Sequence, residues 1–336
     1  MLKKLLLKNN WEGRLRVYSA FSTPRKHMST QLDDPAFLAS SFACDLPQIY
    51  RSALKNLKKI LLPSLLLHLI FPTLILSEIL LFFFVSKKLV VTALLLGGIF
   101  ATLFTYLISF FYTQTKRVTQ LIQLKEEFLK SCREHLLSEP HLALAEAASR
   151  LAIYLEGFES RLYPVHFLNS LAKWFHREDL FRIKKLLLQA AVEEHLKQVR
   201  LTPTNLEVHA SCARIYTLLS RLYRKVGGTA EEKANAAEAL AIQELQILNE
   251  YAPNDPWVYE QLEKGYARLG MQEEQLTALE SLATLRPQDS NILFRLGILY
   301  FHAGFNAKGL QTYQLLKQLN FKKAEELIQR YGQPYR

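Results

Sequence analysis

The stretch FVSKKLVV, residues 84–91, places two adjacent lysines between the two most apolar runs of this 336-residue chain. The runs cover residues 60–85 and 89–112, and the second contains no formally charged side chain. Because about 20 apolar residues in a helix cross a hydrocarbon core of about 30 Å, both runs are long enough to span a membrane. Two such runs back to back are not typical of a soluble core. We therefore predict a two-helix transmembrane hairpin with Lys87 and Lys88 at its tip.

Basic residues are more numerous on the two flanks of this hairpin than at its tip. The tip holds only two lysines, whereas the flanks hold Arg51, Lys55, Lys58 and Lys59 on one side and Lys116, Arg117 and Lys125 on the other. Lys and Arg concentrate on the cytoplasmic side of membrane proteins. We expect both termini to be cytoplasmic and the tip to lie outside.

The formal net charge is +11, and most of it belongs to the membrane half. Residues 1–113 carry 13 Lys/Arg and 5 Asp/Glu, whereas residues 114–336 carry 29 and 26. The excess therefore indicates attraction of residues 60–112 and their basic flanks to anionic lipid. A nucleic-acid partner is not expected, because basic residues interleaved with aromatic residues do not cluster later in the chain.

The N-terminal part is predicted to be a basic, partly disordered cytoplasmic segment over residues 1–59. Its opening MLKKLLLKNN has too short an apolar core for a signal peptide, and Met28 is an alternative start. The three cysteines, Cys44, Cys132 and Cys212, have neither metal-ligand spacing nor an even number for a disulfide framework.

After the hairpin, helical periodicity replaces long apolar runs, and strand alternation is almost absent, so the fold class is predicted to be all-α. Residues 113–202 are expected to form a helical linker of degenerate helical repeats. The individual helices are predicted over residues 118–137, 142–158, 164–175 and 180–199.

An internal repeat becomes visible when the chain is aligned on Pro253 and Pro287, which are 34 residues apart. Leucine, tyrosine and glycine recur at the same spacing, in the pairs Leu262/Leu296, Tyr266/Tyr300 and Gly270/Gly304. Each glycine suits the tight turn between two helices. Asp255 followed by Pro256 is typical of a helix start.

These units resemble the tetratricopeptide repeat. The pattern departs from the family at Glu263, Gln275, Gly309 and Phe321. A third, longer unit is predicted over residues 203–253, and a helix over residues 322–331 is expected to cap the array. The resemblance implies an α-solenoid over residues 203–336.

No enzyme, cofactor or metal site is expected. The nine histidines are dispersed, and neither Gly97-Gly98 nor Gly227-Gly228 is followed by the Lys-Ser/Thr of a phosphate loop. Glu78, within the first apolar run, has two interpretations. Its side chain belongs to a proton or ion path, or it forms an interhelical hydrogen bond where Gly97-Gly98 lets the two helices approach closely. His68 is expected to lie opposite Tyr106.

The resemblance implies a concave groove that binds a protein or peptide. Lys264 and Arg268 would suit acidic groups, and Phe294, Ile298 and Phe301 would suit an amphipathic helix unless the C-terminal chain covers them. The full set of groove candidates is Arg214, Trp257, Glu260, Lys264, Arg268, Asn291, Phe294, Ile298, Phe301 and His302.

The leading hypothesis is a membrane-anchored bacterial scaffold in the inner membrane. The chain resembles bacterial inner-membrane proteins that join two N-terminal transmembrane helices to tetratricopeptide repeats, although their first helix begins nearer the N-terminus. The alternatives are an oligomeric channel or transporter subunit that uses Glu78, assembled through the hairpin, and an inclusion-membrane protein secreted by intracellular bacteria, which the hydropathy pattern resembles.

Overall fold

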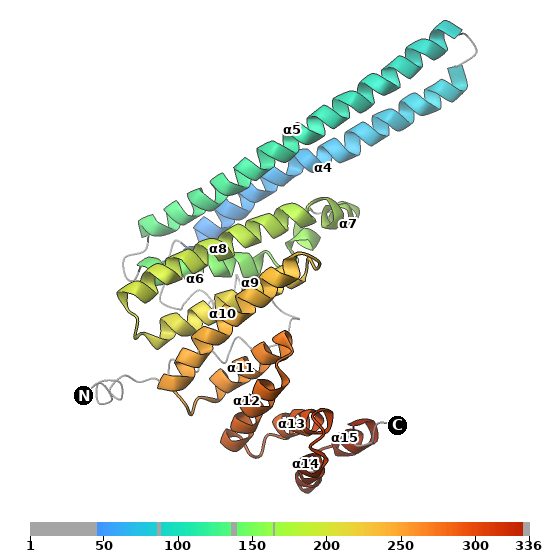
Figure 1. Ribbon diagram of the computed structural model, residues 1–336. Coiled ribbons are helices and arrows are strands. Elements are labelled where there is room, and N and C mark those ends of the chain that lie inside the picture. The colour runs from blue at the N-terminus through green and yellow to red at the C-terminus, as the bar shows by residue number, and fades with distance from the viewer. Residues whose placement is uncertain (1–45, 86–88, 136–139, 164, 332–336) are drawn as a thin grey trace.

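The computed structural model describes residues 46–85, 89–135, 140–163 and 165–331 (Figure 1). Regular structure in these ranges is helical throughout, which confirms the all-α class. The helices are α4 (Leu46–Val85), α5 (Leu89–His135), α6 (Pro140–Tyr154), the 3₁₀ turn η2 (Phe158–Arg161), α7 (His166–Phe175), α8 (Arg177–Leu201), α9 (Leu206–Arg224), α10 (Ala230–Tyr251), α11 (Pro256–Leu269), α12 (Gln272–Leu285), α13 (Ser290–His302), α14 (Asn306–Gln318) and α15 (Ala324–Tyr331).

Helices α4 and α5 form a long antiparallel hairpin that projects from the other helices (Figure 1). By length and composition, each contains a segment that is apolar enough to span a membrane, with mean hydropathy of 2.2 and 2.1. Large apolar side chains are exposed along the projecting part, and Phe83 and Phe84 near the tip are 75% and 80% exposed. An exposed apolar surface of this extent indicates a membrane or protein environment rather than water.

The boundary expected at residue 60 is corrected by the structure, because α4 begins at Leu46. Residues 46–59, assigned above to a partly disordered segment, continue the first hairpin helix toward the rest of the protein. The remainder of that segment, residues 1–45, lies outside the described residues. Helix α5 runs without a break from Leu89 to His135, so the segments predicted over residues 89–112 and 118–137 form one helix.

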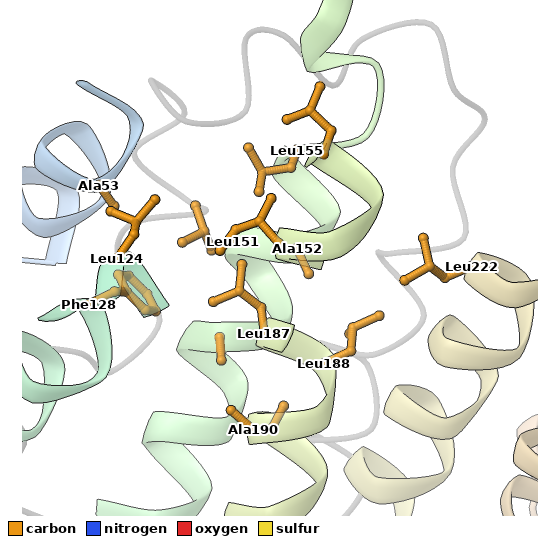
Figure 2. Close-up of a cluster of buried hydrophobic side chains, with 14 of the residues drawn as sticks. Ala53, Leu124, Phe128, Leu151, Ala152, Leu155, Leu187, Leu188, Ala190 and Leu222 are labelled. Atoms are coloured by element: carbon orange, nitrogen blue, oxygen red, sulfur yellow. The ribbon is translucent and has the colours of Figure 1, made fainter. Parts of the chain in front are cut away.

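The base of the hairpin belongs to the largest hydrophobic core of the protein. Leu57 and Leu61 of α4 are fully buried with residues of α5, α6, α8 and α9. Figure 2 shows part of this cluster, in which Leu124 and Phe128 of α5 lie on one side and Leu187 of α8 lies at the centre. The hydroxyl of Tyr50 also donates a hydrogen bond to a backbone carbonyl of α6, at 3.1 Å.

The helices between hairpin and repeats lie close to their predicted positions. The structure places α6 at Pro140–Tyr154, α7 at His166–Phe175 and α8 at Arg177–Leu201, so the differences are confined to helix ends. Helix α8 packs on both α6 and α9 and also contacts α5, which makes it the element that joins the hairpin to the C-terminal helices.

From α9 to α15, each helix packs against the next one along the chain (Figure 1). The predicted start signal is confirmed, because the Asp255 side chain accepts a hydrogen bond from the backbone N–H of Trp257 at 2.9 Å and Pro256 opens α11. Gly270 and Gly304 adopt φ of 74° and 80°, the left-handed conformation that glycine favours. The two units therefore turn at equivalent positions.

Candidate functional site

The charged residues predicted to line a groove on α11 are already paired within the chain. The ammonium nitrogen of Lys264 lies 2.6 Å from a carboxylate oxygen of Glu260, one helical turn earlier, and both side chains are partly exposed. Arg268 lies 2.6 Å from Glu238 of α10, whose side chain is 1% exposed. Because Arg268 neutralises a buried carboxylate, it has a structural task, whereas Lys264 remains open to a ligand.

Two further candidates lie on neighbouring helices. Arg214 of α9 is half-buried and is engaged in an interaction within the chain. Trp257, at the start of α11, packs half-buried against a core cluster that includes Ala213 and Val258. Neither residue is therefore freely exposed to a ligand.

The residues of α13 that were predicted to form an apolar groove surface differ in how far they are buried. Asn291 is exposed, and Ile298 is half-buried. Phe294 is half-buried, with its ring centroid 5.6 Å from that of Phe321. Phe294 is therefore partly covered by Phe321, a residue nearer the C-terminus, as one of the two alternatives for this surface expected.

Phe301 is corrected from a groove residue to a core residue. It is 7% exposed, and its ring occupies the space beside Gly309 of α14, where an added Cβ would lie 2.7 Å from the ring. A side chain at position 309 would therefore displace the ring. His302 is exposed and meets Tyr331 of α15 edge-on, at 5.4 Å between centroids.

Two other departures from the repeat pattern form a polar bridge across three helices. Glu263 of α11 is buried, and it accepts a hydrogen bond from the Gln275 side chain of α12 at 2.9 Å. Arg295 of α13 forms an ion pair with the same carboxylate. The buried carboxylate of Glu263 is thus hydrogen-bonded by a side chain of α12 and paired with a side chain of α13.

Gly297 of α13 is closest to the final helix rather than to α14. An added Cβ would lie 2.7 Å from Cδ2 of Leu327 and 3.4 Å from Cγ2 of Thr312. We expect Gly297→Leu to lower the free energy of unfolding by about 1–3 kcal/mol, because the larger side chain would displace α15. Thermal unfolding of the full chain in detergent would measure this. Gly98→Leu is the matched control, since nothing lies within 4 Å of its Cβ position, and an equal loss in both variants would contradict the prediction.

Aromatic rings join the hairpin to α7. His68 of α4 accepts or donates a hydrogen bond with the Tyr106 hydroxyl at 3.0 Å, which confirms the predicted pairing. The His68 ring also stacks on Phe175 of α7, with centroids 4.4 Å apart and planes 15° from parallel. Phe110 completes the cluster, 5.7 Å from His68.

Directly beside this cluster, Arg117 of α5 forms an ion pair with Asp179 of α8, and both side chains are at most 5% exposed. Burial raises the pKa of the Asp179 carboxyl, and the charge of Arg117 opposes that rise. Burial, followed by the charge of Arg117, lowers the pKa of His176 to about 4. The buried Arg117–Asp179 ion pair thus connects the hairpin to α8, and His176 is buried at the start of that helix.

Glu78 makes an interhelical hydrogen bond, but not the one expected from the sequence. The Thr102 hydroxyl of α5 donates to its carboxyl group at 2.7 Å. The predicted close approach at Gly97 and Gly98 is wrong, because a Cβ at either position would meet nothing within 4 Å. This hydrogen bond links the two helices of the hairpin, as expected if Glu78 has a structural role.

A polar cleft of about 230 Å³ lies between α5 and α8. At its wall, the carboxylate of Glu194 lies 2.5 Å from His141 and 2.8 Å from Lys197. Burial opposes ionisation there, yet hydrogen bonds from Lys197 and His141 hold the pKa of Glu194 below its ordinary value. Basic and acidic side chains alternate along its wall, and Glu194 is paired within the chain.

Within the described ranges, no group of three or more His, Cys, Asp or Glu side chains is arranged to hold a metal ion. No family model fits the sequence, and no curated protein is detectably similar to it.

Proposed function

We propose that the protein is a membrane-anchored adaptor, in which the α4–α5 hairpin spans a membrane and the C-terminal helices bind a protein partner. The observation that carries this proposal is the division of the hairpin into two parts. Its tip half exposes apolar side chains, whereas its base half contributes to the core of the helical domain.

The exposed half has the dimensions of a bilayer. On α4, the last fully buried leucine of the base is Leu65, and the helix ends at Val85. These roughly 20 residues rise about 30 Å, the thickness of a hydrocarbon core. On α5, exposed apolar side chains recur from Val90 to Tyr112, and Lys116 follows. Beyond it, only Val118 and Ile122 of this helix are large apolar residues with exposed side chains, at 36% and 43%.

The anchor and the domain share one core, which distinguishes this arrangement from a domain on a flexible tether. The buried leucines of α4 and the Arg117–Asp179 ion pair both fix the hairpin to the helices around α8. A bound partner would therefore be held at a defined orientation to the membrane.

A tetratricopeptide-like solenoid over α9–α15 is part of the proposal. Leu262 and Leu296 are buried at equivalent positions, and so are Tyr266 and Tyr300. The final helix α15 packs on α13 and α14 through the fully buried Leu327, as a capping helix would. Such arrays bind peptides or helices of other proteins on the face formed by the first helix of each pair.

The proposed topology places both termini in the cytoplasm of a bacterial cell, with the hairpin in the inner membrane. In a protein with Cys44 replaced by serine, Ser86→Cys should react with a membrane-impermeant maleimide added to intact cells. Gln329→Cys, on the exposed face of α15, should react only after the cells are opened. Labelling of Gln329→Cys alone in intact cells would reverse the orientation.

The binding surface is tested once proximity labelling from the C-terminus has identified a partner. For an acidic ligand, Lys264→Glu should weaken binding at least about tenfold, because it reverses charge at a partly exposed position without breaking a buried pair. Arg330→Glu is the matched control, since it disrupts another exposed pair of residues four apart, on α15. Equal affinities for both variants, measured by calorimetry, would place recognition elsewhere.

A further inference from the structure

Helix α7 is amphipathic, and only one half of its apolar surface is covered by protein. Ala172 is fully buried, and Phe175 packs on His68 of the hairpin. Phe167 and Trp174 are 65% and 77% exposed. These two residues are seven positions apart, which places them on the same face of the helix, two turns from each other. The helix therefore presents a second apolar face that the described residues leave open.

The position of α7 along the hairpin is where the lipid-facing part begins. Phe175 stacks on His68, three residues beyond Leu65, the last fully buried leucine of the α4 base. In Figure 1, α7 lies at the end of α8, next to the hairpin. If the tip half spans the bilayer, α7 is at the height of the headgroups.

A continuous series of rings connects the open face of α7 to the lipid-facing face of α5. The Trp174 centroid lies 4.8 Å from Phe175, which stacks on His68; His68 lies 5.7 Å from Phe110, and Phe110 lies 5.5 Å from the exposed Phe111. Aromatic residues gather at membrane–water interfaces because their rings are apolar and their edges are polar.

We propose that α7 lies in the plane of the membrane interface, with Phe167 and Trp174 inserted among lipids of the leaflet from which the hairpin base emerges. This inference rests on the proposed function. The exposed ammonium groups of Lys173 on α7 and Lys116 on α5 suit the phosphate groups of anionic lipids at that depth. The hairpin and α7 would then attach the helical domain to the membrane at two places, which fixes both its distance from the membrane and its tilt relative to the membrane plane.

The test uses the native tryptophan as a depth reporter. The chain has three tryptophans, so Trp11→Phe with Trp257→Phe leaves Trp174 as the only one. The full chain is reconstituted in vesicles of phosphatidylcholine and phosphatidylglycerol, with bromine either near the headgroup end or near the methyl end of the acyl chains. We expect a blue-shifted emission for Trp174 and a loss of most of its intensity with the shallow bromines.

Two matched proteins complete the experiment. The protein that retains only Trp257 should show no loss with either lipid, because α11 is remote from the hairpin (Figure 1). A tryptophan-free protein with Phe104→Trp places the reporter at an exposed position on the tip half of α5, and the deep bromines should quench it most strongly. In the protein with Trp174 alone, Phe167→Asp should reduce the quenching while helicity is retained.

The outcomes separate this inference from the proposed function. Absence of quenching at position 104 would overturn the membrane anchor itself. Quenching at position 104 with water-like, unquenched emission from Trp174 would leave the anchor intact and overturn the placement of α7. Blue-shifted but unquenched emission from Trp174 would show that protein, from a second copy or from rearrangement of this one, covers the face instead of lipid.

Discussion

Replacing Arg117 by alanine is expected to lower the free energy of unfolding by about 3–5 kcal/mol, because it leaves the buried carboxylate of Asp179 without its partner. The effect should also be local: amide hydrogen exchange should increase first where the hairpin meets α8. Thermal and denaturant unfolding of the full chain in detergent, followed by circular dichroism, would measure the loss.

Helix α8, which carries Asp179, offers a matched control. Arg182 and Glu178 of α8 form an exposed ion pair four residues apart, so Arg182→Ala should cost at most about 0.5 kcal/mol. The double variant Arg117→Met with Asp179→Leu should recover much of the stability, since two apolar side chains replace both charges. A similar loss for Arg117→Ala and Arg182→Ala would contradict the buried pair.

The second large effect is expected for Leu187→Ala, which should cost about 2–5 kcal/mol. Leu187 is fully buried at the centre of the cluster in Figure 2, where α8 meets the hairpin base. The substitution removes apolar contacts and opens a cavity where Ala53, Leu124 and Phe128 line the same space. The unfolding midpoint in detergent would report the loss.

Two leucines of the same helix provide the comparison, since Leu196 and Leu201 are 39% and 67% exposed. Leu201→Ala should change stability by no more than about 0.5 kcal/mol, and Leu196→Ala should fall between the two. A cost for Leu187→Ala no larger than that for Leu201→Ala would show that the hairpin base does not share a core with α8.

Local patterns in the sequence determined the helices themselves. The two apolar runs around residues 86–88 predict a hairpin because their lengths match a bilayer. Asp255 and Pro256 predict a helix start, and Gly270 and Gly304 predict turns, because each signal acts within a few residues of itself. The repeat spacing of 34 residues is likewise visible in the sequence alone.

The sequence predicted only part of the length of the first hairpin helix, which begins at Leu46. Tyr50, Ala53, Leu57 and Leu61 recur at helical spacing and are buried, but the surrounding lysines concealed this narrow apolar stripe. A stripe this narrow predicts a helix only when its partner is known, and here the partners lie in α5, α6 and α8.

Only the tertiary structure decided which faces of the helices are covered. Phe301 is buried because Gly309 leaves space for its ring, and Arg268 is occupied by Glu238, 30 residues earlier in the chain. Likewise, Phe175 meets His68 although more than 100 residues separate them in the sequence. Periodicity records which side of a helix is apolar, whereas packing between distant segments determines whether protein, lipid or a partner covers that side.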